Sequence, residues 1–276
     1  SAAGVIEPHQ AVVCAGTSHI HFDECGAIER FAGCRVLALD VAHGKIEPAS
    51  LAQVPDGHGM PHQSQPRVLS ITQASELGTV YTPDEVRLLA DAAHDRGWLL
   101  HMDGARLANA AAALDLPLRE VTRDAGVDLL SFGGTKCGLL AGEVVLVFAA
   151  GLAPHMPYTR KQGLQLASKM RFLSAQFLAL LDDELWRHMA QHANAMARRL
   201  HDRVRGLPGL QITHPQESNA VFARLPASAL AQLRQEWRMA LWDEAAGEVR
   251  WMASWDTTPE DVDDFAESIL VATKDT

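Results

Sequence analysis

Val127-Asp128-Leu129-Leu130-Ser131-Phe132-Gly133-Gly134-Thr135-Lys136 is the stretch that decides the fold of this chain. Its first six residues form a mainly apolar run, which predicts a short buried strand. The two glycines that follow let the backbone come close to a bulky group. An amine held beside them, partly desolvated, loses some of its preference for the ammonium form and can add to an aldehyde. The alternative for Lys136 is the ordinary one of a solvated lysine just past a strand.

A second apolar run, Trp98-Leu99-Leu100-His101-Met102-Asp103-Gly104-Ala105-Arg106, ends in a carboxylate, a glycine and an arginine. Ligands bind at the carboxyl edge of an open parallel sheet, so we expect Asp103 and Lys136 at one edge. A carboxylate there can keep a pyridine nitrogen protonated while the amine holds an aldehyde, which predicts pyridoxal phosphate as the cofactor. Arg106 carries a planar fork suited to a substrate carboxylate. Taken singly, Asp-Gly is a common turn and an arginine is common at a helix start.

Apolar runs of strand length recur along the first part of the chain, with helix-like segments between them. We expect strands at residues 11–14, 35–39, 68–71, 99–102, 129–132 and 144–148. This alternation predicts an α/β fold with a mostly parallel sheet flanked by helices. Thr82-Pro83-Asp84-Glu85 supplies an N-cap, a proline in the first turn and acidic residues at the positive end of a crossover helix.

The second part of the chain has a different pattern. Residues 164–205 are helical in pattern, with a break expected at 181–183. Beyond Pro208 we expect short strands at 211–213, 220–225, 238–242 and 248–254, a helix at 227–235, and a terminal helix from Thr258-Pro259-Glu260. The chain is therefore expected to divide into a large cofactor-binding domain, residues 1–180, and a small C-terminal α+β domain, residues 181–276.

His101-Met102-Asp103-Gly104-Ala105-Arg106 followed by Ser131-Phe132-Gly133-Gly134-Thr135-Lys136 resembles the threonine aldolase family, in particular the bacterial low-specificity L-threonine aldolases. Further similar stretches cover essentially the whole chain: Thr17-Ser18-His19-Ile20, Asp23-Glu24-Cys25-Gly26-Ala27, Thr72-Gln73, Glu76-Leu77-Gly78-Thr79-Val80-Tyr81, Ser168-Lys169-Met170-Arg171, Val249-Arg250-Trp251 and Ser254-Trp255-Asp256-Thr257. The resemblance implies the aspartate-aminotransferase-like fold (fold type I) of pyridoxal phosphate enzymes. It also implies retro-aldol cleavage of L-threonine, L-allo-threonine and related β-hydroxy-α-amino acids to glycine and an aldehyde.

Lys136, Asp103 and His19 are the catalytic residues that the resemblance implies. Lys136 holds the cofactor, Asp103 keeps its ring nitrogen protonated, and His19 lies over the ring unless it is a loop histidine bonded to backbone. His101 shares a side of its strand with Asp103, because side chains alternate with a period of two, and is either behind the ring or an ordinary core histidine. Thr135 is placed to give a hydroxyl to the phosphate, although a threonine at a strand end needs no such role.

Arg106 and Arg250 are expected to bind the substrate carboxylate. Arg250 lies in a predicted strand, where a buried cation requires an anionic partner. Arg171, Arg160 and Lys161 resemble family positions near the cofactor phosphate or near a neighbouring subunit's site. Basic residues on a helix are, however, usually just solvated.

One departure from the family concerns the start of the chain. Members that it resembles carry about 70 further residues there, by analogy, including a Gly-Thr segment that holds the phosphate and a serine that helps bind the substrate carboxylate. We therefore expect the large domain to lack them, either because the chain is a fragment or because it is a natural truncation that binds its cofactor poorly. Thr72-Gln73-Ala74-Ser75-Glu76 stands where other members have a histidine near the substrate hydroxyl, so the base falls to another residue or to water.

Composition excludes several other classes of protein. A formal net charge of −10 argues against a nucleic-acid surface, and no apolar stretch approaches the roughly 20 residues that span a bilayer. We expect no signal peptide at the start of the sequence. His19 with His21, and His58 with His62, lack a third ligand nearby, so no metal is expected. Four cysteines without metal-ligand spacing favour reduced thiols in a cytoplasmic protein: Cys14, Cys25, Cys34 and Cys137.

Two points about function stay open from the sequence. The cofactor-binding residues alone do not separate an aldolase from another lyase or a racemase acting on a β-substituted amino acid. The missing phosphate-binding segment leaves a third reading, a catalytically impaired oligomeric homologue. By analogy with the family we expect a homodimer or homotetramer with shared active sites, and no nucleic-acid or membrane partner.

Overall fold

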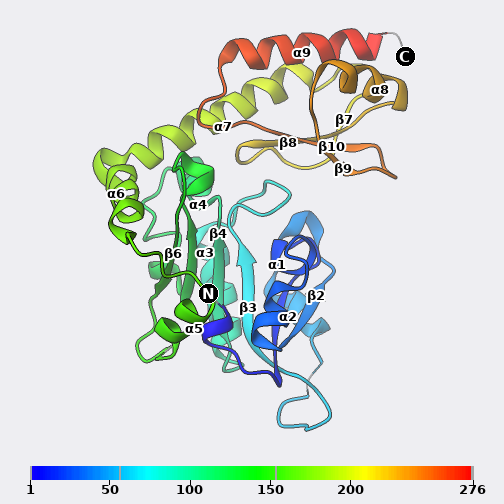
Figure 1. Cartoon of the computed structure of the whole chain (residues 1–276). Coiled ribbons are helices and arrows are strands. Elements are labelled where there is room, and N and C mark those ends of the chain that lie inside the picture. Colours follow the sequence, from blue (N-terminus) through cyan, green and yellow to red (C-terminus); the bar gives the residue numbers. More distant parts are fainter. Residues whose placement is uncertain (1, 56, 153, 275–276) are drawn as a thin grey trace.

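A six-stranded sheet forms the larger part of this computed structural model, which describes residues 2–55, 57–152 and 154–274. The strand order is β2-β1-β3-β4-β5-β6, with β1 to β5 parallel and β6 antiparallel to β5 (Figure 1). The strands are β1 Gln10–Ala15, β2 Arg35–Leu39, β3 Gln65–Thr72, β4 Leu99–Gly104, β5 Leu129–Gly133 and β6 Glu143–Val147. The prediction of a mostly parallel sheet with six strands at these places is confirmed.

Helices of the larger part are α1 His19–Phe22, α2 Ala27–Ala32, α3 Pro83–His94, α4 Leu107–Leu114, α5 Met156–Gln162 and α6 Met170–Leu181. Short 3-10 turns join them: η1 Ala2–Gly4, η2 Ala42–Gly44, η3 Pro48–Gln53, η4 Arg123–Ala125, η5 Thr135–Cys137 and η6 Asp182–Glu184. The predicted helix over residues 164–205 begins later than expected, at Met170, because Gly163 ends α5 and the six residues after it form no helix. The break predicted at 181–183 is present as η6.

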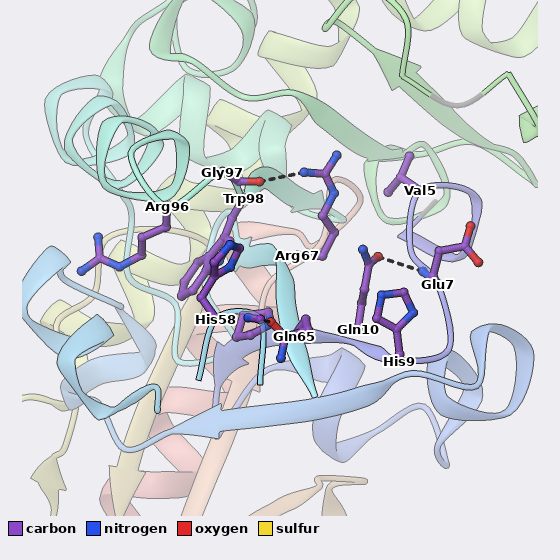
Figure 2. Close-up of a pocket in the computed structure, with 12 residues that line it drawn as sticks. Val5, Glu7, His9, Gln10, His58, Gln65, Arg67, Arg96, Gly97 and Trp98 are labelled. Carbon is purple, nitrogen blue, oxygen red and sulfur yellow. Dashed lines mark hydrogen bonds between the residues drawn. The ribbon is translucent and has the colours of Figure 1, made fainter. Parts of the chain in front are cut away.

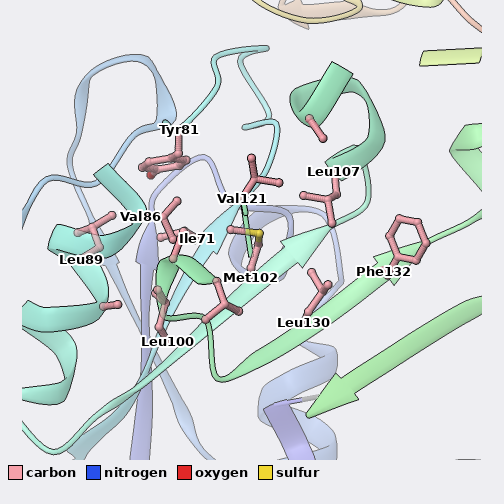
Figure 3. Close-up of a cluster of buried hydrophobic side chains, with 14 of the residues drawn as sticks. Ile71, Tyr81, Val86, Leu89, Leu100, Met102, Leu107, Val121, Leu130 and Phe132 are labelled. Carbon is pink, nitrogen blue, oxygen red and sulfur yellow. The ribbon is translucent and has the colours of Figure 1, made fainter. Parts of the chain in front are cut away.

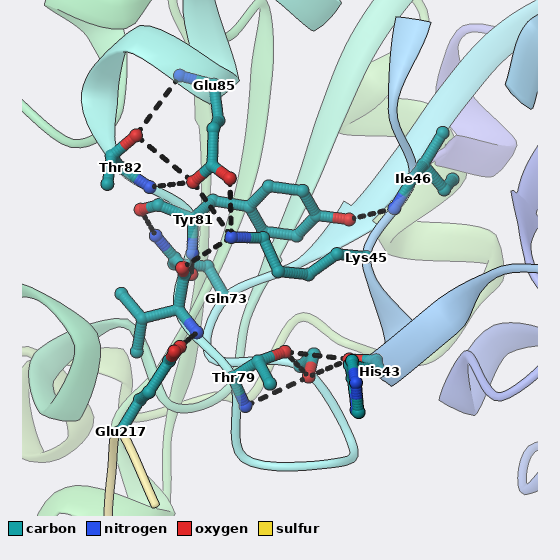
Figure 4. Close-up of polar contacts among 11 residues, drawn as sticks. His43, Lys45, Ile46, Gln73, Thr79, Tyr81, Thr82, Glu85 and Glu217 are labelled. Carbon is teal, nitrogen blue, oxygen red and sulfur yellow. Dashed lines mark hydrogen bonds and ion pairs between the residues drawn. The ribbon is translucent and has the colours of Figure 1, made fainter. Parts of the chain in front are cut away.

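The start of α3 carries the cap that the sequence predicts. Thr82 Oγ1 accepts a hydrogen bond from the Glu85 N–H, and Glu85 Oε2 accepts one from the Thr82 N–H. Lys45 Nζ then donates to both Glu85 oxygens, at 2.7 and 2.8 Å, and to the Val80 carbonyl (Figure 4). Gln73 exchanges two hydrogen bonds with the backbone of Tyr81. These contacts fix the loop between β3 and α3, which lies at the carboxyl edge of the sheet.

The main core lies between the sheet and helices α3 and α4 (Figure 3). Ile71, Leu100, Met102 and Leu130 point into it from three adjacent strands, and Leu107 packs on them from α4. Each fully buried side chain of this size contributes roughly 1.5–3 kcal/mol of transfer free energy. The core therefore holds the strand ends at fixed positions.

A four-stranded antiparallel sheet with the order β7-β8-β10-β9 forms the smaller part. Its elements are β7 Gln211–Ile212, β8 Ala220–Arg224, β9 Leu241–Asp243 and β10 Glu248–Met252, with helices α7 Leu185–Val204, α8 Ala227–Glu236 and α9 Pro259–Lys274. The strand predicted at 238–242 starts later, at Leu241, because pairing with β10 begins there and shifts register between Glu248 and Val249.

Helix α7 belongs to both cores. Trp186 and Ala190 pack in the core of the large sheet, whereas Ala197 and Val204 pack under the small one. Figure 1 shows α7 running from one sheet to the other. We propose a division into domains at residues 1–180 and 181–276, with α7 as the element that joins their cores. Among the described residues, no helix is both long enough and apolar enough to cross a membrane.

Candidate active site

Several parallel strands of the large sheet end at one edge, and most of the residues that the sequence singles out lie there. His19 follows β1, Arg106 follows β4 and Lys136 follows β5, while Asp103 lies in β4 itself. β2 pairs on one side of β1 and β3 on the other, so the chain changes direction between β1 and β3. Ligands of open α/β sheets bind outside the carboxyl ends of strands at such a point.

Lys136 lies in the turn η5, directly after β5. The backbone just before this turn passes so close to Ala105 that residue 133 must be glycine, because a Cβ at Gly133 would come within 2.9 Å of the Ala105 Cα. The pKa of Lys136 is lowered by burial first and then by the positive charge of Arg106, while Asp103 opposes the shift. In this chain the Lys136 residue is nevertheless exposed to solvent, so the environment acts on only part of the side chain. The result is an amine that gives up its proton more readily than a surface lysine does.

Asp103 stands on the strand beside that of Lys136, with Ser131 of β5 and Thr72 of β3 as its register partners. Its Oδ1 accepts a hydrogen bond from the Ala105 N–H at 2.9 Å, which fixes the carboxylate. The charge of Asp103 acts on the pKa of both Lys136 and Arg106. The carboxylate and the amine therefore share one site.

His101 is buried in the sheet behind Asp103. Its Nδ1 lies 2.8 Å from the Ser70 Oγ and its Nε2 lies 3.0 Å from the Ser131 Oγ, on the two flanking strands. Burial lowers the pKa of His101 to about 4, so the ring is neutral at pH 7. A neutral ring between two hydroxyls fits a position behind the site.

Arg106 and Arg250 come from the two different sheets. Arg106 is half-buried before α4, and its pKa is lowered by burial and then by the charge of Arg250. Arg250 is half-buried in β10, and its guanidinium lies 4.6 Å from the centre of the Trp242 ring. Among the described residues neither guanidinium forms an ion pair. Two neighbouring cations without a carboxylate partner are suited to bind a substrate carboxylate.

His19 and Thr135 lie at the rim of the site. The His19 N–H donates to the Glu76 Oε1 at 2.8 Å, and its ring Nδ1 lies 3.1 Å from the Glu24 Oε1. The ring is largely exposed, which leaves its face accessible to a ligand. The Thr135 hydroxyl donates to the Glu143 Oε1 at 2.8 Å, so a phosphate would have to compete with that carboxylate.

Arg160, Lys161 and Arg171 face solvent on α5 and at the start of α6. Arg160 Nε donates to the Gln165 carbonyl at 3.1 Å, and the Arg171 guanidinium lies over the ring of its neighbour Phe172. The groups that shift the pKa of Lys136 are instead Arg106, Asp103, Glu143 and Arg250. The three basic residues thus lie outside the cluster that the structure brings together.

Sequence reasoning assigned no role to Glu76 or Trp242. Glu76 is only 7% exposed, and its Oε1 accepts hydrogen bonds from the His19 N–H and from the Thr72 hydroxyl, both at 2.8 Å. Burial is the main cause of its raised pKa. The signal in the sequence is a charged residue inside an otherwise uncharged segment after a strand.

A cavity lies elsewhere, at the amino edge of the sheet (Figure 2). It measures about 520 Å³, and Gln10, Gln65 and Trp98 line it where β1, β3 and β4 begin. The strands run away from this edge, so the cavity is remote from Lys136. No group of three metal-ligating side chains occurs in the part of the chain that the structure describes.

The donor set at the carboxyl edge fits pyridoxal phosphate. Lys136 offers an amine whose pKa is lowered, and Asp103 offers a fixed carboxylate on the adjacent strand. Glu76 Oε2 and Thr17 Oγ1 are buried here without a hydrogen-bond partner among the described residues, as expected of a polar site that receives a ligand.

Comparison with known proteins agrees with this chemistry. A family model described as beta-eliminating lyase matches residues 1–228. A low specificity L-threonine aldolase of Pseudomonas aeruginosa is 42% identical over 269 residues, which are 97% of this chain and 78% of the relative. A relative of the same description from Saccharomyces cerevisiae is 23% identical and covers 82% of this chain and 58% of its own length.

Solved structures share the architecture. The threonine aldolase of Leishmania major superposes with a TM-score of 0.91 at 28% identity, over 98% of this chain and 80% of its own. A putative aromatic amino acid beta-eliminating lyase/threonine aldolase from Exiguobacterium superposes with a TM-score of 0.73 at 19% identity, over 95% of this chain and 75% of its own. The second likeness concerns the fold alone.

Proposed function

Because this chain belongs to the beta-eliminating lyase family, we propose that it is a pyridoxal-phosphate-dependent aldolase that cleaves L-threonine, L-allo-threonine and related β-hydroxy-α-amino acids to glycine and an aldehyde. The observation that carries the proposal is the pairing of Lys136 and Asp103 on adjacent strand ends, with two arginines beside them. The 42% identity to low specificity L-threonine aldolases over 97% of the chain supports it.

When bound, pyridoxal phosphate supplies an aldehyde for an amine and a ring that accepts an electron pair. In the proposal, Lys136 would hold the cofactor through its amine. Asp103 keeps the ring nitrogen protonated, and His19 covers one face of the ring. Arg106 and Arg250 bind the substrate carboxylate. The orientation that they give the substrate would determine which bond at Cα is cleaved.

The remaining predicted residues keep supporting roles in the proposal. His101 lies behind the ring and, being neutral, does not repel the protonated ring nitrogen. Thr135 reaches the phosphate only if its hydroxyl leaves Glu143. Arg160, Lys161 and Arg171 contact the phosphate or a neighbouring subunit's site, which agrees with their exposure on this chain.

Incubation of the purified protein with pyridoxal phosphate and L-threonine tests the function. We expect equimolar acetaldehyde and glycine, measured by a coupled alcohol dehydrogenase assay and by amino-acid analysis. Release of a 2-oxo acid with ammonia would instead identify a β-eliminating enzyme, and appearance of the D-isomer alone would identify a racemase. Either outcome would overturn the aldolase proposal while leaving the cofactor assignment intact.

We also propose that the protein is a homodimer or homotetramer with shared active sites. Large apolar side chains are exposed on the loop after η5 and on α6: Leu140 is 93% exposed, Phe172 60% and Leu178 72%. Exposed apolar side chains of this size are available to a subunit interface. Light scattering on the protein as it elutes from a size-exclusion column is expected to give a multiple of 30.0 kDa. A monomer mass would contradict the proposal.

We propose a cytoplasmic location. The four free cysteines agree with the reducing conditions of the cytoplasm.

A further inference from the structure

Glu76 is a buried carboxylate that the mechanism above does not use. It follows β3, between the loop that carries His19 and the strand that carries Asp103. Its side chain is held by two donors from different segments, the His19 N–H and the Thr72 hydroxyl. The rigid loop described above, tied down by Gln73 and Lys45, fixes its backbone (Figure 4). Glu76 therefore has a defined position at the carboxyl edge.

The two oxygens of Glu76 differ in their surroundings. Oε1 accepts both hydrogen bonds, so it points its lone pairs at protein donors. Oε2 is buried and has no hydrogen-bond partner among the described residues. Any proton on Glu76 must accordingly reside on Oε2, because Oε1 is already occupied. A buried polar atom without a partner is costly in a native structure, and this one is explained if a ligand supplies the missing donor.

Charged groups from several elements surround this carboxylate. Asp103 of β4 raises its pKa, and Glu76 in turn acts on the pKa of Arg106 before α4 and of Arg250 in β10. Cys14 of β1 and Tyr81 of the same loop are also within reach of its charge, and both are themselves neutral at pH 7. Glu76 thus faces the two arginines that bind the substrate carboxylate in the proposed function.

We propose that Glu76 is a further catalytic residue, whose Oε2 accepts the proton of the substrate's β-hydroxyl as the Cα–Cβ bond breaks. This inference rests on the proposed function. The O–H electron pair becomes the second bond of the aldehyde carbonyl, and the Cα–Cβ pair stays on Cα. Cα then takes up one proton to complete glycine, and Glu76 returns its proton to water. No oxidant or other co-reactant is needed.

Free glycine, used as a test substrate, distinguishes this role from other roles that Glu76 could have. Glycine has the ammonium and carboxylate groups of threonine but no hydroxyl. If Glu76 bound the substrate amine or merely held His19 in place, exchange of the glycine Cα hydrogen with solvent would need it as well. If Glu76 acts on the hydroxyl, that exchange proceeds without it.

The test is Glu76→Gln, which keeps the shape and the acceptor for the His19 N–H but places a group at Oε2 that takes no proton. We expect kcat for L-threonine to fall about 10²–10⁴-fold, as is usual on loss of a general base. Binding of pyridoxal phosphate, seen as visible absorbance, is expected to persist. The rate of deuterium exchange into glycine, followed by proton NMR, is expected to stay within about threefold of wild type. Equal losses in cleavage and exchange, or undiminished cleavage, would overturn the proposal.

Glu217→Gln is the matched control. Glu217 Oε2 also accepts a backbone N–H of this loop, from Val80 at 2.7 Å, but it lies at the exposed surface. This variant is expected to cleave threonine at the wild-type rate. If wild type releases no acetaldehyde, the aldolase proposal and this inference both fall. Undiminished cleavage by Glu76→Gln would remove only the inference.

The wild-type protein alone provides a second test, which does not depend on the folding of a variant. The pKa of Glu76 is raised, and proton acceptance requires the carboxylate. The rate of threonine cleavage is therefore expected to decline as pH falls through that pKa, whereas the rate of glycine exchange is not. The same decline at low pH in both rates would contradict the inference.

Thermal unfolding checks the raised pKa of Glu76 separately. Because that pKa is raised in the folded state, the wild-type protein loses stability as pH rises through it. The glutamine variant has no such loss, so the difference between its unfolding midpoint and that of wild type should increase with pH.

Discussion

Replacing Lys136 with alanine is expected to abolish the visible absorbance of the bound cofactor and to reduce threonine cleavage by about 10⁴-fold or more. The reason is the position of the amine, directly after β5, where burial and Arg106 lower its pKa. A methyl group there can neither hold an aldehyde nor exchange it with a substrate amine.

Lys274→Ala is the matched control for this prediction. Lys274 is exposed at the end of α9, in the smaller part of the molecule, and has no role in the proposed site. Its removal is expected to leave the absorbance of the bound cofactor intact. A Lys136→Ala protein with an unchanged visible spectrum and full turnover would refute the assignment of the cofactor to this lysine.

Asp103→Asn is expected to lower kcat by about 10²–10³-fold with the cofactor still attached to Lys136. The amide oxygen can still accept the Ala105 N–H, so the strand end is preserved. The lost group is the negative charge that keeps the ring nitrogen protonated and lets the ring accept electrons. Steady-state kinetics with L-threonine measure the effect, and Arg250→Ala should contrast with it by raising KM more than it lowers kcat.

Asp128→Asn provides the control at the opposite edge of the same sheet. Asp128 directly precedes β5; its Oδ2 accepts the Leu100 N–H at 2.8 Å near the amino end of β4 and lies 2.8 Å from the His94 Nε2. That substitution can affect stability but is expected to leave kcat unchanged. If both aspartate variants keep the wild-type kcat, Asp103 has no electronic role at the ring.

Much of the fold follows from local features of the sequence. Strands β1 to β6 are short apolar runs bounded by turns, and the α3 cap is read directly from Thr82 to Glu85. Lys136 and Asp103 could be placed at one edge because each ends such a run. The start of β9 could not be predicted, since it depends on pairing with β10 across a register shift.

The electrostatic details of the site depend on contacts between distant segments. The environment of Glu76 requires the His19 N–H, which is brought near by the pairing of β1 with β3. The stacking of Arg250 on Trp242 depends on the pairing of β10 with β9. His19 is 57 residues from Glu76 in the sequence, so the contact between them is not apparent from the residues around either one.

The sharing of α7 between the two cores has a consequence for substrate scope. Arg106 belongs to the large sheet and Arg250 to the small one, and α7 packs on α4 through Asn109 and Asn194, which exchange hydrogen bonds. This single helix therefore joins the part of the molecule that carries Arg106 to the part that carries Arg250. Enzyme engineers seeking acceptance of bulkier amino acids could vary side chains along α7, at a remove from the chemistry, and leave every ligand-binding group untouched.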